Sequence, residues 1–539
     1  MNILQLMTLV EKMFADRLPY MILNQEIAEN FYPQRADFTV RREFSTQYAN
    51  DLMTSYPILT RRDLGDQIGQ MLRPTATQWF RMVPKGGEKT NNEGLRWLEM
   101  ANDRMRAAMY AKPSMFQRAT KEGDQDYSCF GQNVISCRPN RNVDNLLYRN
   151  WHLRDMAWIE DEEGKYTVVA RKWNPTAYDL KSMFGDKAGP KVQKLIDKNQ
   201  HFTKVKCHHI VVSSEMYDQQ SLGRPLFSIF YNTEHKEIME EVPVWTNEYI
   251  ISRWQTVSGS QYAFSPATIT ALPDARLLQS MTYTILEAGE KATNPPLVAT
   301  QDVVRSDAAI YAGGITWVDK DYDEKLGSAI RPLTQDLRGL PFGQDMILDS
   351  RALLSQAFYL NKLTLPQRAP EMTAYEVGQR IQEYIRGALP IFEPMETEYN
   401  GGLCQTTFEV LMRQGVFGSP RDIPPQLMQD GIDFEYESPL HDAIEEQKGQ
   451  MFLETKALIA EAMTIDQGAA FVMDSRTALR DALTGVGVPA HWLNSEDDVE
   501  EMVANAADQQ QQAMDMEQAL RGSEVAKNTA AAGKQLEMV

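Results

Sequence analysis

The chain has 539 residues, which is long enough for about three or four domains. Hydrophobic residues make up 43% of it and charged residues 24%, and 74 acidic against 55 basic side chains give a net charge of −19. Such an acidic surface disfavours tight binding to DNA phosphates or anionic membranes, although a duplex that slides past without adhering is compatible with it. The four cysteines are too scattered for a disulfide framework, so we expect a reducing compartment.

Residues 1 to about 120 are predicted to be mostly helical. The first apolar residues follow the spacing of an amphipathic helix, interspersed with charges that a signal peptide would lack: Leu4, Met7, Val10 and Met13. A further helical pattern ends at Pro74, and the Trp79–Phe80 pair after it is predicted to be buried. No run of about 18 apolar residues exists, so we expect no membrane span.

The pattern changes to strands between about residues 127 and 270. Three runs are rich in β-branched and apolar residues: 133–137, 166–170 and 210–213. The acidic segment 161–164, which ends in glycine, is predicted to be a hairpin turn. A short helix is predicted at 175–184, with Asn174 as its cap and Gly185 at its end.

Two helical patterns, at 274–294 and 349–364, flank a mixed segment that contains glycines. The first predicts a rod of roughly 31 Å. Each pattern has an apolar stripe, formed by Leu277, Leu278, Met281, Ile285 and Ala288 in the first and by Leu353, Ala357 and Leu360 in the second. The stripes fit two interpretations equally well: struts of a ring wall, or a pair of surface helices on a core.

A loop at 365–370 follows, with a proline near each end. Thr373 and Glu376 then have the spacing of a capping box, which predicts the start of a third helix. Pro390 and Pro394 must kink or interrupt this helix, and the pattern finishes at Gly415. Residues 440–520 are again predicted to be helical, with a weakly structured end.

Sequence motifs for catalysis or metal binding are missing. There is no phosphate-binding loop and no nucleophile elbow, and a calcium-like run at 319–323 has Glu324 where the loop needs glycine. Neighbouring strand residues point to opposite faces, so Cys207, His208 and His209 are not expected to converge on one ion. The acidic run at 160–163 is interpreted as a solvated surface. We therefore predict no catalytic residue, no metal site and no cofactor.

Several blocks of sequence resemble the portal (head-to-tail connector) proteins of short-tailed, T7-like bacteriophages. They occur in that family's order over nearly the whole chain: Ile68-Gly-Gln-Met-Leu-Arg-Pro74 with Trp79-Phe80, Ser252-Arg-Trp254, Tyr262-Ala-Phe-Ser-Pro266, Leu272-Pro-Asp-Ala275, Lys291-Ala-Thr-Asn-Pro-Pro-Leu297, Met372-Thr-Ala-Tyr-Glu-Val377 and Gly485-Val-Gly-Val-Pro489. Each block alone is weak, and together they are fairly specific. One departure is Ala263-Phe264, where the family pattern has glycine and a polar residue, and this puts a local turn in question.

The resemblance implies an α+β, mostly helical portal fold assembled as a ring of twelve copies. The implied parts are a wing at 1–272, stem helices at 273–294 and 349–364, a clip at 295–348, a tunnel loop at 365–372, a long wing helix and return strand at 373–439, and a helical crown at 440–539. The implied location is one vertex of the virion capsid, at the head-tail junction, after assembly in the host cytoplasm. The implied partners are double-stranded DNA during packaging and ejection, the terminase large subunit, a tail adaptor, and the major capsid and scaffolding proteins.

Five side chains are our candidates for facing DNA in the channel: Lys291, Arg351, Lys362, Gln367 and Arg368. A few cations of this kind touch phosphate while the acidic balance keeps the duplex mobile. Two alternatives stay open, which are a virion enzyme (a nuclease, or a muramidase that uses a carboxylate pair) and a scaffold or adaptor that binds protein only. A ring seen in solution favours the channel, and a stable monomer with hydrolytic activity favours an enzyme.

Overall fold

The computed structural model describes residues 1–40, 52–75, 77–85, 92–217, 222–299, 317, 330–332, 339–363, 393–425, 427, 431–436, 455–459, 478–479, 483, 499 and 502–505. The chain divides into two compact units, Met1–Trp79 with Ala107–Arg413, and Phe80–Arg106 with Gln414–Val539. Within the described ranges no helix has the length and apolar content needed to cross a bilayer. The predicted tunnel loop, the capping box at 373–376 and nearly all of the predicted helices beyond residue 440 lie outside these ranges.

The larger sheet of the first unit has five antiparallel strands in sequential order. They are β4 (Met156–Glu160), β5 (Tyr166–Trp173), β6 (Cys207–Ser213), β7 (Leu226–Asn232) and β8 (Glu237–Val244). The predicted strands at 166–170 and 210–213 are thereby confirmed. The predicted turn joins β4 to β5, because the Asp161 carboxylate accepts the amides of Glu163 and Lys165 at 2.9 and 2.8 Å, and Gly164 adopts a φ of +79°.

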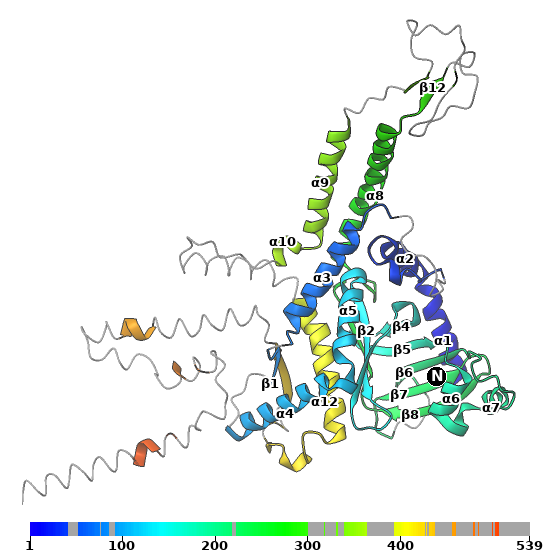
Figure 1. The fold of residues 1–539 in the computed structure, drawn as a ribbon. Coiled ribbons are helices and arrows are strands. Elements are labelled where there is room, and N and C mark those ends of the chain that lie inside the picture. Colours follow the sequence, from blue (N-terminus) through cyan, green and yellow to red (C-terminus); the bar gives the residue numbers. More distant parts are fainter. Residues whose placement is uncertain are drawn as a thin grey trace, which may run out of the picture. The chain divides into compact units, whose positions relative to one another are not determined.

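Helices cover both faces of this sheet (Figure 1). On one face lies α1 (Ile3–Asp16), which buries Leu6, Met7, Val10, Met13 and Phe14. On the other lie α6 (Ala177–Phe184) and α7 (Pro190–Asp197). The predicted amphipathic helix is confirmed as α1, and of the four residues that indicated it Met7, Val10 and Met13 are buried whereas Leu4 is 59% exposed. The helical period places Leu6 on the sheet instead, one turn before Val10.

The predicted short helix is confirmed as α6, but its cap is not Asn174. Thr176 accepts a hydrogen bond from the Asp179 amide at 3.2 Å, and the Asp179 carboxylate accepts the Thr176 amide at 3.2 Å. This reciprocal pair satisfies two donors at the helix start. Asn174 cannot take this role, because α6 begins at Ala177 and Asn174 lies two residues before the cap position. The helix ends at Gly185, as predicted, with a φ of +58°.

A second sheet of the first unit has the order β3-β2-β9, with β2 (Gln132–Pro139) between β3 (Leu146–Asn150) and β9 (Tyr249–Arg253). Helix α5 (Phe116–Phe130) packs against β2 and β3, and it also contacts α2 (Leu18–Phe31) and α3 (Tyr56–Leu72). The predicted helix before Pro74 and the predicted strand at 133–137 are confirmed by α3 and β2. The local turn in question at Ala263 and Phe264 is the short strand β11 (Ala263–Phe264), paired with β10 (Gln255–Thr256).

The second unit contains a two-stranded antiparallel sheet, β1 (Phe80–Pro84) with β14 (Ile432–Tyr436), and most of α4 (Asn92–Tyr110). Inside this unit Phe80 packs edge-on to Phe434, with ring centroids 6.4 Å apart, and Trp97 lies 6.3 Å from Phe417. Trp79 and Phe80 are each fully buried, as predicted. The described chain thus combines helices with antiparallel sheets, which agrees with the predicted α+β class.

Candidate channel-forming helices and their anchor

The first predicted stem helix is α8 (Pro266–Thr293) of the first unit, which starts seven residues before the predicted Pro273. Ser265 caps it by accepting the Thr268 amide at 3.4 Å, and Pro266 stands at the first helical position, where no amide proton is needed. The Ser265 hydroxyl also donates to the Ser128 carbonyl at 2.8 Å, which ties the helix start to α5. Pro273 lies inside α8 on its exposed side and leaves the Ile269 carbonyl without a helical donor, on a side of the helix that water reaches.

The second predicted stem helix is α9 (Gly339–Ala357), followed by the short α10 (Leu360–Leu363). The prediction of one helix over 349–364 is therefore wrong in two respects: the helix starts ten residues earlier, and it is interrupted between residues 357 and 360. Pro341 falls in the first turn, where proline is compatible with a helix. The helix breaks where Tyr359 adopts a left-handed φ of +56°, next to Phe358, which is buried against Phe31 with centroids 5.4 Å apart.

Helices α8 and α9 lie side by side (Figure 1), and the antiparallel strands β12 (Leu297–Ala299) and β13 (Ile330–Pro332) belong to the segment that joins them. Leu278 and Leu354 are fully buried. Gly343 faces Ile285 so closely that a Cβ atom there would lie 3.1 Å from Cδ1 of Ile285. This close approach explains why a glycine stands inside α9 instead of ending it.

Residues 53–56 bind to both helices near their base. The side-chain oxygen of Gln279 on α8 accepts the amides of Met53 and Thr54 at 2.7 and 3.0 Å. The Tyr56 hydroxyl lies 2.6 Å from the Ser355 hydroxyl and donates to the Arg351 carbonyl at 3.2 Å, both on α9. The helix pair is therefore attached at its base by ordered hydrogen bonds, in addition to its buried apolar contacts.

Large apolar side chains remain exposed along both helices. Phe342, Met346 and Leu353 are 69%, 37% and 51% exposed, and their spacing places them along one side of α9. The other large exposed apolar side chains of the pair are Ile269, Leu277, Tyr283 and Leu286 on α8 and Leu348 on α9. The predicted stripe of α8 is thus divided, because Leu278 is buried within the chain while Leu277 is 46% exposed.

Of the predicted channel cations, Lys291 and Arg351 have described side chains, and these two lie at separate levels of the helix pair. Nζ of Lys291, in the last turn of α8, lies 2.6 Å from the Glu287 carboxylate. The Arg351 guanidinium lies over the Tyr56 ring, 5.4 Å from its centroid, near the base of the pair. Gln279 and Arg351 both contact residues 53–56, so they mark the same level along the helix pair. Lys291 lies twelve residues further along α8, at about 18 Å from that level. Lys362 belongs to α10, and Gln367 and Arg368 lie outside the described residues.

The helix pair carries little net charge. Three acidic and two basic residues on α8, and two acidic and one basic on α9, leave each helix with one negative charge. The pairing of Lys291 with Glu287 further reduces the free positive charge at the end of α8. A polyanion alongside these helices would meet weak repulsion and few fixed contacts.

The chain re-enters the described part at residue 393 through a π-helix, η7 (Met395–Asn400), which leads into α12 (Gly401–Gln414). Arg73 anchors this π-helix. Its guanidinium pairs with the Asp124 carboxylate, donates to Oδ1 of Asn400 at 2.7 Å and lies 4.3 Å from the centroid of the Tyr399 ring. The side chains of Arg73 and Asp124 are only 3% and 5% exposed, so the pair is held in a medium that strengthens it.

A second arginine, Arg253 at the end of β9, binds the same π-helix. Its Nε and one terminal nitrogen donate to the two Glu398 carboxylate oxygens at 3.1 and 3.0 Å, and its other terminal nitrogen donates to Glu160 at 2.5 Å. Both arginines were missed as functional candidates from sequence. Arg73 ends the block at 68–74 and Arg253 is central in the block at 252–254, so the resemblance marked their positions without giving their partners.

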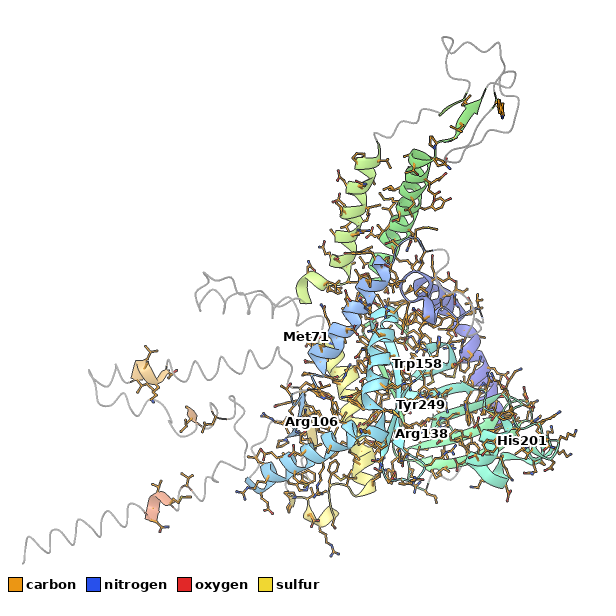
Figure 2. The ribbon with its side chains drawn as sticks, viewed as in Figure 1. Met71, Arg106, Arg138, Trp158, His201 and Tyr249 are labelled. Atoms are coloured by element: carbon orange, nitrogen blue, oxygen red, sulfur yellow. The ribbon has the colours of Figure 1, made fainter. Side chains whose placement is uncertain are left out.

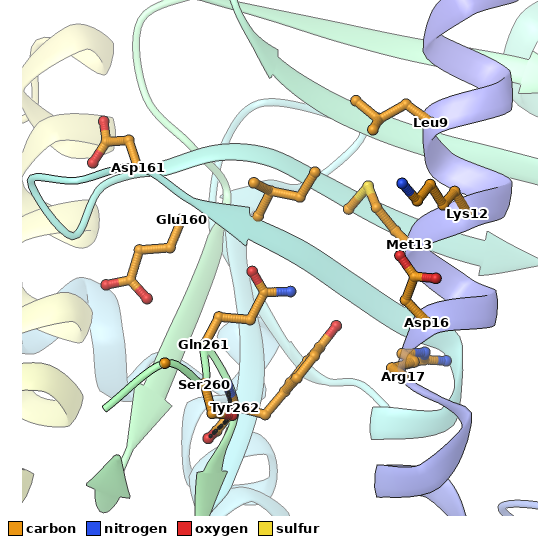
Figure 3. A pocket seen from close by; sticks show the side chains of 12 residues that line it. Leu9, Lys12, Met13, Asp16, Arg17, Glu160, Asp161, Ser260, Gln261 and Tyr262 are labelled. Atoms are coloured by element: carbon orange, nitrogen blue, oxygen red, sulfur yellow. Dashed lines mark hydrogen bonds between the residues drawn. The ribbon is translucent and has the colours of Figure 1, made fainter. Parts of the chain in front are cut away.

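A pocket of about 690 Å³ lies between α1, the end of β4 and residues 259–262 (Figure 3). Arg17 lines it and donates from its terminal nitrogens to three carbonyl groups at the start of β4, including that of Leu153 at 2.8 Å. Of the carboxylates that line this pocket, Glu160 is bound by Arg253 and Asp161 accepts the amides of its own turn. These two acidic groups therefore bind other parts of the chain and do not form a free carboxylate pair.

The Cys207–His209 segment lies in β6, and its two histidines point to opposite faces of the sheet. His208 stacks on Phe14 with centroids 5.9 Å apart, whereas His209 stacks on Phe230 at 4.0 Å and lies 2.5 Å from the Tyr249 hydroxyl. Burial lowers the pKa of both imidazoles, to about 4 for His208. The described part of the chain contains no group of three or more potential metal-binding side chains. All four cysteines are buried free thiols.

The profile of the family described as "Bacteriophage head to tail connecting protein" matches residues 4–493. The chain is 23% identical over 434 residues to a probable portal protein of Bordetella phage BPP-1, which covers 78% of this chain and 76% of that protein. It is 20% identical over 377 residues to the portal protein of Salmonella phage epsilon15, covering 68% and 66% respectively. Because the family profile spans nearly its whole length, this chain belongs to the family of bacteriophage head-to-tail connecting, or portal, proteins.

Proposed function

We propose that twelve copies of this chain form a ring at one capsid vertex, and that double-stranded DNA passes through its central channel during packaging and ejection. The observation that carries the proposal is the exposed apolar surface on the α8–α9 pair. Phe342, Met346 and Leu353 would be left in water by a single copy, and side-by-side packing of neighbouring copies would bury them. A ring needs such a contact between unlike faces of neighbouring subunits.

The parts of the ring follow the family resemblance, with bounds adjusted to the helices. Residues 1–272 would form the wing, and α8 from Pro273 onward and α9 would form the stem. The clip would shorten to 295–338, because α9 begins at Gly339. The tunnel loop would be 365–372, the long wing helix and return strand 373–439, and the crown 440–539. β14 (Ile432–Tyr436) falls within the range of that return strand.

The ring would act by holding and guiding DNA, with no bond made or broken by this chain. The clip would bind the terminase large subunit during packaging and the tail adaptor afterwards, and the wing would contact the major capsid and scaffolding proteins. Assembly would take place in the host cytoplasm and the finished ring would remain in the virion at the head-tail junction. The relatives that are named portal proteins support this assignment.

The channel wall would contact DNA weakly and at separate levels. Lys291 and Arg351 would form two tiers about 18 Å apart along α8 and α9. Lys362, Gln367 and Arg368 would form a third near the tunnel loop. The single net negative charge on each helix would keep the duplex mobile, because few phosphates would be neutralised at any one level.

An assembly experiment tests the ring. We expect the wild-type chain to sediment as an assembly of about 740 kDa, twelve times its mass of 61.4 kDa. Leu353→Asp should shift the population to small species, because a charge would enter the buried contact between copies. Gln344→Asp is the matched control, because Gln344 is exposed and lies roughly opposite the Phe342–Leu353 side of the same helix. Equal assembly by the two variants would contradict the proposed interface.

A second experiment tests the tunnel loop separately from the ring. Deletion of residues 367–369 should leave assembly unchanged and reduce the amount of DNA packaged or retained in particles. Full packaging by particles that carry this deletion would exclude the loop from a role at the DNA, while leaving the ring proposal intact.

A further inference from the structure

Four arginines gather on one side of the first unit, around the β2–β3 hairpin and the end of β5: Arg138, Arg141, Arg149 and Arg171. We call this cluster the arginine face. None of the four forms an ion pair within 4 Å among the residues that the structure describes. By contrast, Arg73 and Arg253 each bind carboxylates. In a chain with a net charge of −19, an unneutralised cluster of this kind is a local exception.

Trp151 organises the arginine face. The guanidinium carbons of Arg171 and Arg149 lie 3.9 and 4.4 Å from the centroid of its ring, and its indole nitrogen donates to the Ser136 hydroxyl at 2.9 Å. Arg171 is only 3% exposed, and its Nε donates to the Tyr249 hydroxyl at 2.8 Å. Burying a guanidinium without a carboxylate partner costs folding free energy, which points to a role for this positive charge in binding.

The charges of the cluster act on one another. Burial, then the charges of Arg171 and Arg138, lower the pKa of the Arg149 guanidinium. Two carboxylates act on the cluster. Glu248 interacts with Arg138 and Arg171; burial raises its pKa, and these two guanidinium groups oppose this effect. Glu122, which is paired with Arg118 at 2.9 Å, acts on Arg149. Even when both are ionised, Glu248 and Glu122 contribute two negative charges against the four positive ones of the cluster, so the face keeps a net positive field.

A pocket of about 550 Å³ adjoins the cluster. Arg138 and Arg141 line it together with the side chains of Asn140 and Asn142, and Leu147 and Met183 supply apolar wall. Arg141 is held by a hydrogen bond from its terminal nitrogen to the Ser182 hydroxyl, at 3.2 Å. Arg138 lies near Tyr249 because β2 pairs with β9 (Figure 2). The pocket thus combines positive charge, amide hydrogen-bonding groups and apolar surface.

We propose that the arginine face binds an acidic segment of a partner protein, with carboxylates on the guanidinium groups and an apolar side chain against Leu147 and Met183. Guanidinium groups bind carboxylates in a planar, bidentate geometry, and the Asn142 amide suits a peptide backbone. The Asn140 amide is used in its own turn, where it donates to Asp144 and accepts the amides of Asp144 and Asn145. An acidic peptide fits better than nucleic acid for two reasons. Trp151 is already occupied by two guanidinium groups and offers little surface for base stacking, and the cations form a compact cluster, not a track that follows phosphates.

The test measures binding of the full-length protein to three fluorescein-labelled probes: a peptide of alternating glutamate and leucine, a single-stranded DNA and a duplex DNA. We expect the peptide to bind more tightly than either DNA, with an affinity that falls as ionic strength rises. The double variant Arg138→Gln/Arg149→Gln should weaken peptide binding by at least about tenfold. The control Arg62→Gln/Lys198→Gln removes the same charge from exposed positions elsewhere and should change it by less than about twofold.

Three outcomes would overturn the proposal: no peptide binding by the wild type, equal binding by the two double variants, or tighter binding to a DNA probe that is lost in the Arg138/Arg149 variant. Circular dichroism and thermal melting check that the variants are folded. If the Arg138/Arg149 variant is unstable, Arg141→Gln replaces it, since Arg141 is exposed and makes only one hydrogen bond to a side chain.

Discussion

Replacement of Arg73 by methionine should loosen the π-helix that follows residue 392. The substitution keeps much of the side-chain volume but leaves the Asp124 carboxylate, 5% exposed, without its partner. Removing one member of a buried ion pair typically costs about 3–5 kcal/mol. The lost hydrogen bond to Asn400 adds about 1 kcal/mol, and protonation of Asp124, whose pKa burial already raises, returns part of the loss. We therefore expect a net loss of about 3–4 kcal/mol in local stability.

Hydrogen exchange is the suitable assay, because global unfolding of so large a chain is not a two-state process. Amides of residues 395–414 should exchange faster in Arg73→Met by about two to three orders of magnitude, the equivalent of that loss. Arg62→Met, on the helix α3 that Arg73 caps, is the control; its pair with Asp63 is half exposed and should contribute less than about 1 kcal/mol. The double variant Arg73→Met/Asp124→Leu should recover most of the protection. Unchanged exchange in Arg73→Met would refute the anchoring role.

Two further predictions concern α8–α9 packing and pH. Gly343→Val should lower the melting temperature, because overpacking against Ile285 costs about 1–3 kcal/mol of stability. Gly289→Ala is the comparison: no atom lies within 4 Å of the added Cβ, and stability should rise by about 0.5–1 kcal/mol. Shifts of the same sign would contradict this packing. Because burial lowers the pKa of His208 to about 4, the unfolded state takes up its proton first as pH falls below about 6.5, and stability should decline by up to about 1.4 kcal/mol per pH unit until about pH 4. Denaturant titrations of His208→Gln should show a shallower decline over this window, and an equal slope in both proteins would exclude the assignment.

The sequence allowed the elements to be predicted where local signals agree. Runs rich in β-branched and apolar residues predicted β2, β5 and β6, and an acidic turn ending in Gly164 predicted the β4–β5 hairpin. The start of α8 was misplaced because Pro273 and Pro266 are both plausible first-turn prolines. Only the bonds of Ser265 to Thr268 and Ser128 decide between them, and the second partner belongs to a distant helix. The start of α9 was not predicted, because a glycine in a sequence usually indicates a helix end. Only the structure shows that Gly343 lies inside the helix, in close contact with Ile285.

The anchor of the π-helix could not be predicted from pattern. Arg73 and Asn400 are 327 positions apart, and Arg253 and Glu398 are 145 apart. No periodicity links residues at such separations, and a buried arginine is indistinguishable from a solvated one in a sequence. The channel cations show the same limit, because only the structure reveals that Lys291 is paired with Glu287 and that Arg351 lies over Tyr56.

The mass of the assembled wild-type protein tests the central claim most directly. Native mass spectrometry of the purified chain should give one dominant assembly of twelve copies of 61.4 kDa, and negative-stain images of the same sample should show rings with a central hole. A protein that stays at 61.4 kDa at every concentration, or that forms only open chains without a hole, would contradict the proposed channel.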